Sequence, residues 1–288
     1  MLAVIPSFDV VKIPLPFLEP VFGEGAAVHA FGLLVMLGFV IGGKVSKMRA
    51  EKLGLDPDVI ERLIGWLVVG TLVGGHVGFG LMYEPEKYLR NPIEFLKFWR
   101  GLSSYGGFVV CVPLSVWFFY KEKVPVWPYM DCLAHGLAVG WFFGRMGCFS
   151  AHDHPGALSD GLLAVQGICQ DDTLMGMPVL ERASAACHDL GLYEALWSLG
   201  MWFLFMAYDR VPRTPGMQIL LLGFLYGPIR FMLDFLRPES TDVRYIGLTT
   251  GQYWSVVFFV GCGWLIWKRR RSNAKPIAFA KQAGTQAG

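Results

Sequence analysis

Residues 217–236 read MQILLLGFLYGPIRFMLDFL. A helix needs about 20 mostly apolar residues to cross the hydrocarbon core of a bilayer, and this segment has that length and composition. It nevertheless contains Arg230 and Asp234. A charged side chain at membrane depth costs at least ~2.5–3.5 kcal/mol, so such residues indicate a functional site. The length and apolar composition of the segment indicate a membrane-spanning helix.

Apolar segments of similar length recur along the 288-residue chain, in which 54% of the residues are hydrophobic and only 17% are charged. This composition argues against a soluble domain, and nothing in it indicates nucleic-acid binding. We predict an all-α, polytopic membrane protein with about seven transmembrane helices. The predicted spans are residues 28–45, 60–83, 105–120, 129–147, 193–208, 217–236 and 252–267.

The predicted domain organisation follows from these spans. Residues 1–27 contain four prolines among apolar residues and are predicted to form an interfacial N-terminal arm. Residues 28–268 are predicted to form the seven-span membrane domain, which includes an outward-facing loop at 149–191, and residues 269–288 a basic cytoplasmic tail. The N-terminus lacks the pattern of a removable signal peptide.

Lysine and arginine predict the orientation, because short cytoplasmic loops carry the excess of both. They are enriched after the first, third and fifth spans and in the C-terminal tail. The N-terminus is therefore predicted outside and the C-terminus inside. The loop at 84–104, which is predicted outside, is an exception that carries four basic residues together with three glutamates.

The charges of the 217–236 segment belong to a longer polar stripe. Tyr226, Arg230, Asp234 and Arg237 are spaced by four, four and three residues, which places them on one side of a helix. One reading is a structural ion pair between Arg230 and Asp234, with Arg237 reaching the surface. The other is an anion site, in which these arginines and Arg145, at the outer end of the 129–147 span, bind a phospholipid headgroup.

Glycines suggest where helices approach each other. Gly70, Gly74 and Gly78 recur at four-residue spacing, as do Gly136, Gly140 and Gly144, which favours close helix packing. A third stretch, Ser104-Tyr105-Gly106-Gly107, predicts a re-entrant or partly broken helix beside a site. Tyr105 is alternatively an interfacial anchor.

Cysteines and histidines give weaker signals. Cys169 and Cys187 lie in the polar loop at a spacing that permits a disulfide without requiring one, whereas the other four cysteines are expected to pack. His152 and His154 lack a third and a fourth ligand at clear spacing, so we predict neither a metal site nor a cofactor. Lone histidines such as His76 and His135 are more often hydrogen-bonded core residues.

Ordered motifs add a resemblance. The chain resembles the bacterial prolipoprotein diacylglyceryl transferase family from about His29 to Trp267. The matching stretches are His29-Ala30-Phe31-Gly32, Gly74-Gly75-His76-Val77-Gly78, Ser104-Tyr105-Gly106-Gly107, Gly144-Arg145-Met146-Gly147-Cys148-Phe149, Leu192-Tyr193-Glu194, Tyr226 with Arg230, Asp234-Phe235-Leu236-Arg237-Pro238 and Gly251-Gln252.

The resemblance implies an enzyme of the bacterial inner membrane. It would transfer the diacylglyceryl group of phosphatidylglycerol to the lipobox cysteine of a secreted prolipoprotein and release glycerol phosphate. On the family pattern Arg145 binds phosphatidylglycerol and Arg230 assists as a catalytic group at the same headgroup. We expect Tyr105 as the second catalytic residue. The further substrate-binding residues are expected to be Tyr226, Asp234, Arg237 and His76.

Several positions depart from the family pattern. Tyr105 stands where the family has a histidine, Cys148 replaces an asparagine, His76 replaces an arginine and Phe31 replaces a tyrosine. The alternative function is therefore a non-catalytic or altered-specificity relative that binds anionic phospholipid.

Overall fold

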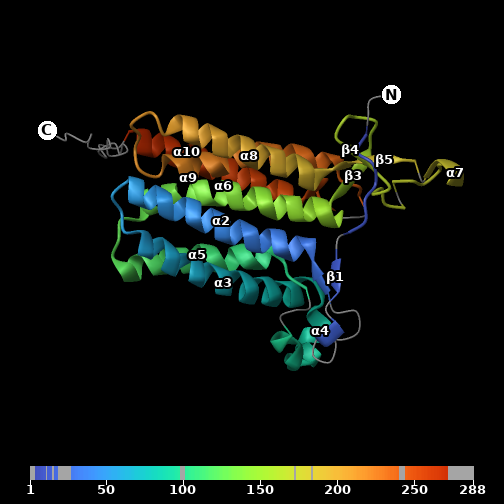
Figure 1. Cartoon of the computed structure of the whole chain (residues 1–288), viewed down its shortest axis with the longest axis horizontal. Helices are drawn as coiled ribbons and strands as arrows, with labels where there is room; N and C mark the ends of the chain where they lie inside the picture. The colour runs from blue at the N-terminus through green and yellow to red at the C-terminus, as the bar shows by residue number, and fades with distance from the viewer. Residues whose placement is uncertain are drawn as a thin grey trace. The chain divides into compact units, whose positions relative to one another are not determined.

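The computed structural model describes residues 4–10, 12–14, 16–18, 27–97, 101–171, 173–182, 184–239 and 244–271 (Figure 1). This part of the chain is mainly helical, and each predicted span corresponds to a long helix. These helices are α2 (Ala30–Lys52), α3 (Pro57–Tyr83), α5 (Ser104–Glu122), α6 (Val126–Ala151), α8 (Leu190–Tyr208), α9 (Met217–Leu233) and α10 (Thr250–Arg270). The shorter helices are η1 (Pro16–Leu18), α4 (Pro85–Arg90), η2 (Pro92–Leu96), α7 (Val179–Arg182) and η3 (Asp234–Leu236).

Among the described residues, four helical segments are long and apolar enough to cross a membrane: α2, α3, α8 and the continuous run Met217–Leu236 formed by α9 and η3. Membrane crossing by α5, α6 and α10 stays a prediction. The tail from residue 272 onward and residues 19–26 of the predicted arm lie outside the described residues.

The described chain divides into two compact units. One contains the residues up to Gly42 together with those from Ala134 onward, and the other contains Gly43–Leu133. In the first unit α9 packs against both α8 and α10. In the second unit α3 packs against α5.

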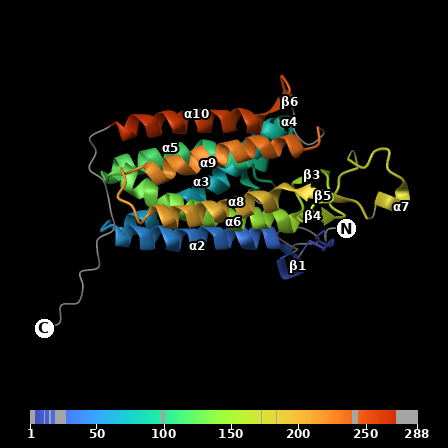
Figure 2. The same ribbon diagram turned by 90° about the horizontal axis from the view of Figure 1, so that it is seen from above.

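The polar loop at 149–191 contains a small sheet, so the all-α prediction was incomplete. Strands β3 (Pro155–Leu158), β5 (Ala186–Asp189) and β4 (Ala164–Gln166) pair antiparallel in that order, beyond the ends of α6 and α8 (Figure 2). The strands have only three or four residues each, too few to show a periodic pattern. Two further pairs join β1 (Lys12–Pro14) to β2 (Ala27–His29) and β6 (Arg244–Tyr245) to β7 (Leu248–Thr249).

The disulfide that the sequence left open is present. Cys169 and Cys187 form a disulfide, with their Cα atoms 5.4 Å apart. The bond joins the middle of the loop to β5. The N-terminal segment also packs on this loop, because Ile5 pairs with Val165 and the Phe8 ring lies 5.2 Å from that of Phe149. Its predicted position at a membrane interface stays a prediction.

The glycines of α3 have the packing role that their spacing predicted. A Cβ atom added at Gly106 would lie 2.3 Å from the carbonyl oxygen of Gly74, so the backbones of α3 and α5 touch. The partly broken helix predicted at this point is wrong, and the re-entrant alternative stays a prediction. Helix α5 is continuous from Ser104, with the Ser103 side chain capping its first turn, because the glycines serve close helix packing rather than an irregular backbone.

A second glycine crossing lies in the first unit. A Cβ atom at Gly42 would lie 2.5 Å from the carbonyl oxygen of Gly136, and one at Gly38 would lie 2.7 Å from that of Gly140. The packing prediction is therefore confirmed for Gly136 and Gly140. It is wrong for Gly144, where an added Cβ atom would meet no atom within 4 Å.

A buried polar cluster joins α6, α8 and α9 near the C-terminal end of α8. Asp209 pairs with Arg213 at 2.8 Å and accepts a hydrogen bond from Gln218 at 2.8 Å, while His135 Nε2 lies 3.3 Å from its second oxygen. His135 Nε2 also forms a hydrogen bond with Gln218 Nε2 at 2.9 Å, which confirms His135 as a hydrogen-bonded core residue.

We predict that Gly106→Ala destabilises the protein because its methyl group has no space against Gly74. Overpacking of this kind costs about 1–3 kcal/mol. Gly107→Ala is the matched control, since its added Cβ atom would lie 3.8 Å from its nearest neighbour and alanine favours a helix. The measurement is the midpoint of thermal unfolding in detergent, and equal midpoints for the two variants would contradict the crossing.

Candidate active site

The site is centred on Glu194, which is fully buried in the second turn of α8. The helix starts at Asp189, whose side chain accepts a hydrogen bond from the Leu192 backbone and so caps it. Glu194 lies 3.0 Å from Arg145 of α6 and 3.0 Å from Arg230 of α9. A single carboxylate therefore holds two arginines from different helices side by side.

Tyr226 of α9 completes this arrangement. Its hydroxyl donates a hydrogen bond to Glu194 and accepts one from the indole nitrogen of Trp141 at 3.0 Å. Arg145 donates to the same hydroxyl at 3.4 Å, and its guanidinium lies 5.1 Å from the centre of the Trp141 ring. These contacts fix the plane and direction of the Arg145 guanidinium.

A second buried carboxylate, that of Asp234, lies one helical turn after Arg230. Asp234 pairs with Arg230 at 3.0 Å and with Arg237 at 2.9 Å, and it accepts a hydrogen bond from Thr249 at 2.5 Å. The structure thus brings four of the predicted residues, Tyr226, Arg230, Asp234 and Arg237, into one stripe and joins Arg145 to it through Glu194. The structural ion pair between Arg230 and Asp234 exists, but Arg237 is also paired rather than reaching out alone.

The ion pairs of this cluster join three arginines to two carboxylates. The side chains of Arg145, Arg230 and Arg237 are 15%, 13% and 10% exposed, so each is largely but not fully buried. Guanidinium groups with surplus positive charge suit an anion such as a phosphate.

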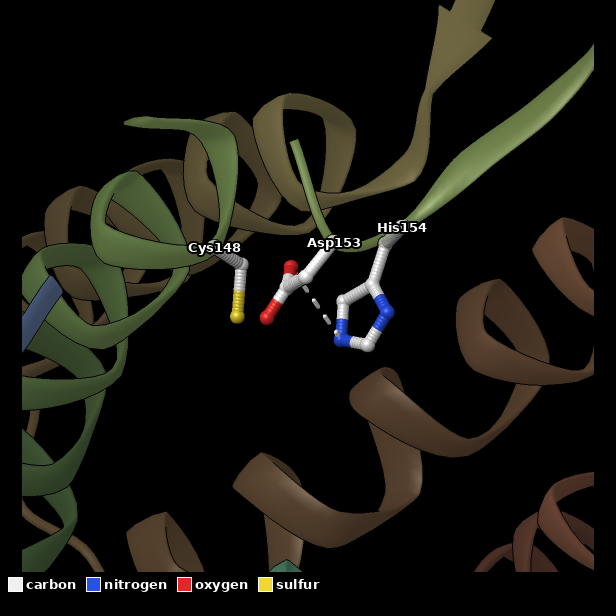
Figure 3. A group of neighbouring side chains, drawn as sticks. All are labelled: Cys148, Asp153 and His154. Atoms are coloured by element: carbon white, nitrogen blue, oxygen red, sulfur yellow. Dashed lines mark ion pairs between the residues drawn. The ribbon is translucent and has the colours of Figure 1, made fainter. Parts of the chain in front are cut away.

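The segment after Arg145 returns to the same place. Cys148 Sγ lies 3.7 Å from Arg145 Nη1, and the side chains of Cys148, Asp153 and His154 point toward one another (Figure 3). Burial lowers the pKa of His154 to about 3, with help from the positive charges of Arg145 and Arg237. Burial also raises the pKa of Asp153, against the opposing effect of Arg145. His154 is therefore a neutral imidazole at neutral pH.

The other two predicted site residues lie in the second compact unit. His76 is buried in α3, with its ring nitrogens 3.2 Å from the carbonyl oxygen of Gly101 and 3.0 Å from that of Glu94. Tyr105 lies in the first turn of α5, where the structure describes its backbone and not its side chain. The predicted roles of His76 and Tyr105 stay predictions.

Sequence reasoning did not assign a role to Glu194, although a signal was present. It is the single charged residue between Leu190 and Tyr208, in an otherwise apolar helix. The rule that singled out Arg230 applies to it equally. Cys148 was expected only to pack, because its neighbours in space come from the loop beyond its helix.

Comparison with known proteins identifies the family of the chain. The family model for prolipoprotein diacylglyceryl transferase matches residues 21–268. The chain belongs to this family. It is 30% identical over 280 residues to the phosphatidylglycerol–prolipoprotein diacylglyceryl transferase of Pseudomonas entomophila, covering 93% of this chain and 99% of that protein. The protein of the same name from Chromohalobacter salexigens is 28% identical, covering 92% of this chain and 94% of its own length.

We predict that Glu194→Gln destabilises this member of the transferase family. The substitution keeps the shape of the side chain but removes the charge that offsets Arg145 and Arg230. Breaking a buried ion pair by removing one partner costs about 3–5 kcal/mol. Thermal unfolding in detergent measures the effect, and Glu86→Gln, at a side chain 85% exposed, is the control that should leave the midpoint unchanged. A Glu194→Gln midpoint equal to that of the native protein would count against the central role of this carboxylate.

Proposed function

We propose that this chain transfers the diacylglyceryl group of phosphatidylglycerol to the cysteine thiol of a prolipoprotein lipobox, with release of glycerol phosphate. Family membership supports the reaction class. The observation that carries the proposal is the cluster of Arg145, Arg230 and Arg237 around two buried carboxylates.

The lipid donor would bind through its phosphate. A phosphodiester carries one negative charge, which matches the surplus of three arginines over the two carboxylates that pair with them. Arg145 would bind the phosphate, since Trp141 and Tyr226 hold its guanidinium in a fixed orientation. Arg230 would assist catalysis by stabilising the charge that develops on the leaving glycerol phosphate. Tyr226, Asp234 and Arg237 would position the two arginines and complete the donor set.

The acceptor thiol must lose its proton before it attacks, because the thiolate is the nucleophile. Tyr105 takes the position of the family's histidine. A neutral phenol with a pKa near ~10 is a weak base at neutral pH, so Tyr105 would orient a reactant or donate a proton. His76 would contribute to substrate binding, as the family pattern at its position implies.

The apolar helices, the basic loops and family membership support the proposed location. The chain would lie in the bacterial inner membrane with its N-terminus outside and its C-terminus in the cytoplasm. The loop at 149–191 would then face the periplasm, where a disulfide such as Cys169–Cys187 persists. The basic residues after α10 would remain inside.

Arg145 provides the first test. Arg145→Ala is expected to lower diacylglyceryl transfer by at least ~10²-fold, the usual effect of removing a group that stabilises transition-state charge. Arg145→Lys should also be impaired, because a lysine lacks the planar fork of donors. Transfer is measured by mass spectrometry of a lipobox peptide incubated with the protein and phosphatidylglycerol.

Arg90→Ala is the control, since the Arg90 side chain is 82% exposed and outside the site. Full activity of Arg145→Ala would remove Arg145 from the site. A native protein that binds phosphatidylglycerol vesicles but never modifies the peptide would overturn the transferase function in favour of a lipid-binding relative.

Tyr105 provides a second test with the same assay. Tyr105→Phe removes the hydroxyl and is expected to lower the rate by about 10²-fold, the lower end for proton-transfer groups. Tyr105→His restores the imidazole of the family pattern and should raise the rate. An unchanged rate in both variants would identify Tyr105 as an interfacial anchor.

A further inference from the structure

Cys148, Asp153 and His154 form a group that the proposed transfer reaction has not used. Cys148 lies in the last turn of α6, and the other two lie in the loop that follows (Figure 3). One ligand atom from each residue lies within 4.8 Å of the others, the single such group of three among the described residues. The Asp153 Oδ1 and His154 Nε2 atoms are 3.8 Å apart.

We propose that these three side chains bind a zinc ion and leave its fourth position open. Thiolate, imidazole and carboxylate are the ligands that zinc takes in proteins, and three protein ligands with one open position are typical of catalytic zinc sites. Zinc bond lengths place tetrahedral ligand atoms roughly 3.3–3.7 Å apart. The 3.8 Å between Asp153 and His154 is close to this separation. All three ligand atoms lie within 4.8 Å of one another, and binding zinc would draw them closer together.

His152 and His154 have different contacts, so only His154 belongs to the proposed zinc site. The His152 ring lies 3.1 Å from the carbonyl oxygen of Phe8 and 3.8 Å from Asp189, so it holds the N-terminal segment and the start of α8. His154 instead faces Cys148 and Asp153. The third ligand that the sequence pattern lacked therefore comes from the end of the preceding helix.

Charge balance is compatible with a cation at this place, because Cys148 and Asp153 supply two negative charges when zinc is bound. When Asp153 is counted with Glu194 and Asp234, three carboxylates offset the three arginines and no surplus remains for an anionic lipid. A zinc ion would be offset by the Cys148 thiolate and the Asp153 carboxylate. The surplus positive charge of the arginine cluster would then be available again to a phosphodiester. Zinc and donor phosphate would thus bind with favourable coupling.

The role of the ion rests on the proposed function. The acceptor thiol would replace a hydroxide bound at the open position, and the thiol proton would leave with that hydroxide as water. A thiol bound to zinc is deprotonated, so the missing imidazole base is not needed. The thiolate sulfur would then form a bond to the glyceryl carbon. The carbon–oxygen bond to the phosphate would break, and its electron pair would leave with glycerol phosphate held by Arg145 and Arg230.

Metal content tests the site without relying on activity. The full chain is purified in detergent from cells grown with added zinc, dialysed and measured by inductively coupled plasma mass spectrometry. We expect about one zinc ion per chain in the native protein. Cys148→Ser and His154→Ala should each lose most of it. Cys262→Ser and His152→Ala are the matched controls and should retain it.

Cobalt substitution reports the ligands directly. A thiolate bound to cobalt gives a charge-transfer absorption band, which we expect in the native protein and in Cys262→Ser but not in Cys148→Ser. Native protein without zinc, full zinc content in Cys148→Ser, or a cobalt spectrum without the thiolate band would each overturn the site.

Transfer assays separate this proposal from the proposed function. Removal of zinc by a chelator should abolish transfer to the lipobox peptide, and added zinc should restore it. Unchanged transfer by zinc-free protein would overturn the role of the ion while supporting the transferase function. Zinc bound by Cys148 in a protein that never transfers the lipid would support the metal site and overturn the transferase function.

Discussion

The buried carboxylate of Glu194 is the constraint on which the rest of the site depends. Two guanidinium groups 3.0 Å from one buried carboxylate are stable there because the carboxylate offsets part of their charge. The contact also fixes the rotation of three helices, since Arg145, Glu194 and Arg230 must meet from α6, α8 and α9. The Asp189 cap determines where α8 begins and hence the position of Glu194 along the helix. Packing, charge and chemistry are thus set by the same contact.

The positions of the long helices were predictable because a bilayer imposes a length and an apolar composition on each span. The stripe from Tyr226 to Arg237 was predictable too, since its residues share one helix and the helical period places them together. The spacing of the glycines predicted close helix packing but not which helices pack together. The spacing predicted a close neighbour for Gly74 but did not show that the neighbour is Gly106, so Gly106 was interpreted as part of an irregular backbone.

Contacts between segments that are distant in the sequence could not be predicted from it, and the reason is physical. Glu194 acquires its role from two arginines, one 49 residues before it and one 36 residues after it, and spacing within one helix carries no information about such partners. The short strands of the 149–191 loop lack enough residues for a periodic signal. The contacts of Cys148 could not be predicted either, because its partners Asp153 and His154 come close only after α6 ends and the chain turns back.

That turn has a consequence for how the protein can diversify. Arg145 and the group of Cys148, Asp153 and His154 occupy ten consecutive residues, in which the helical part determines the direction of Arg145 and the length of the turn determines whether the loop reaches Cys148. Replacing one side chain alters one contact. Inserting or deleting a single residue between Arg145 and His154 would rotate or displace every group beyond it. Natural variants of this segment are therefore expected to differ in residue type while keeping its length.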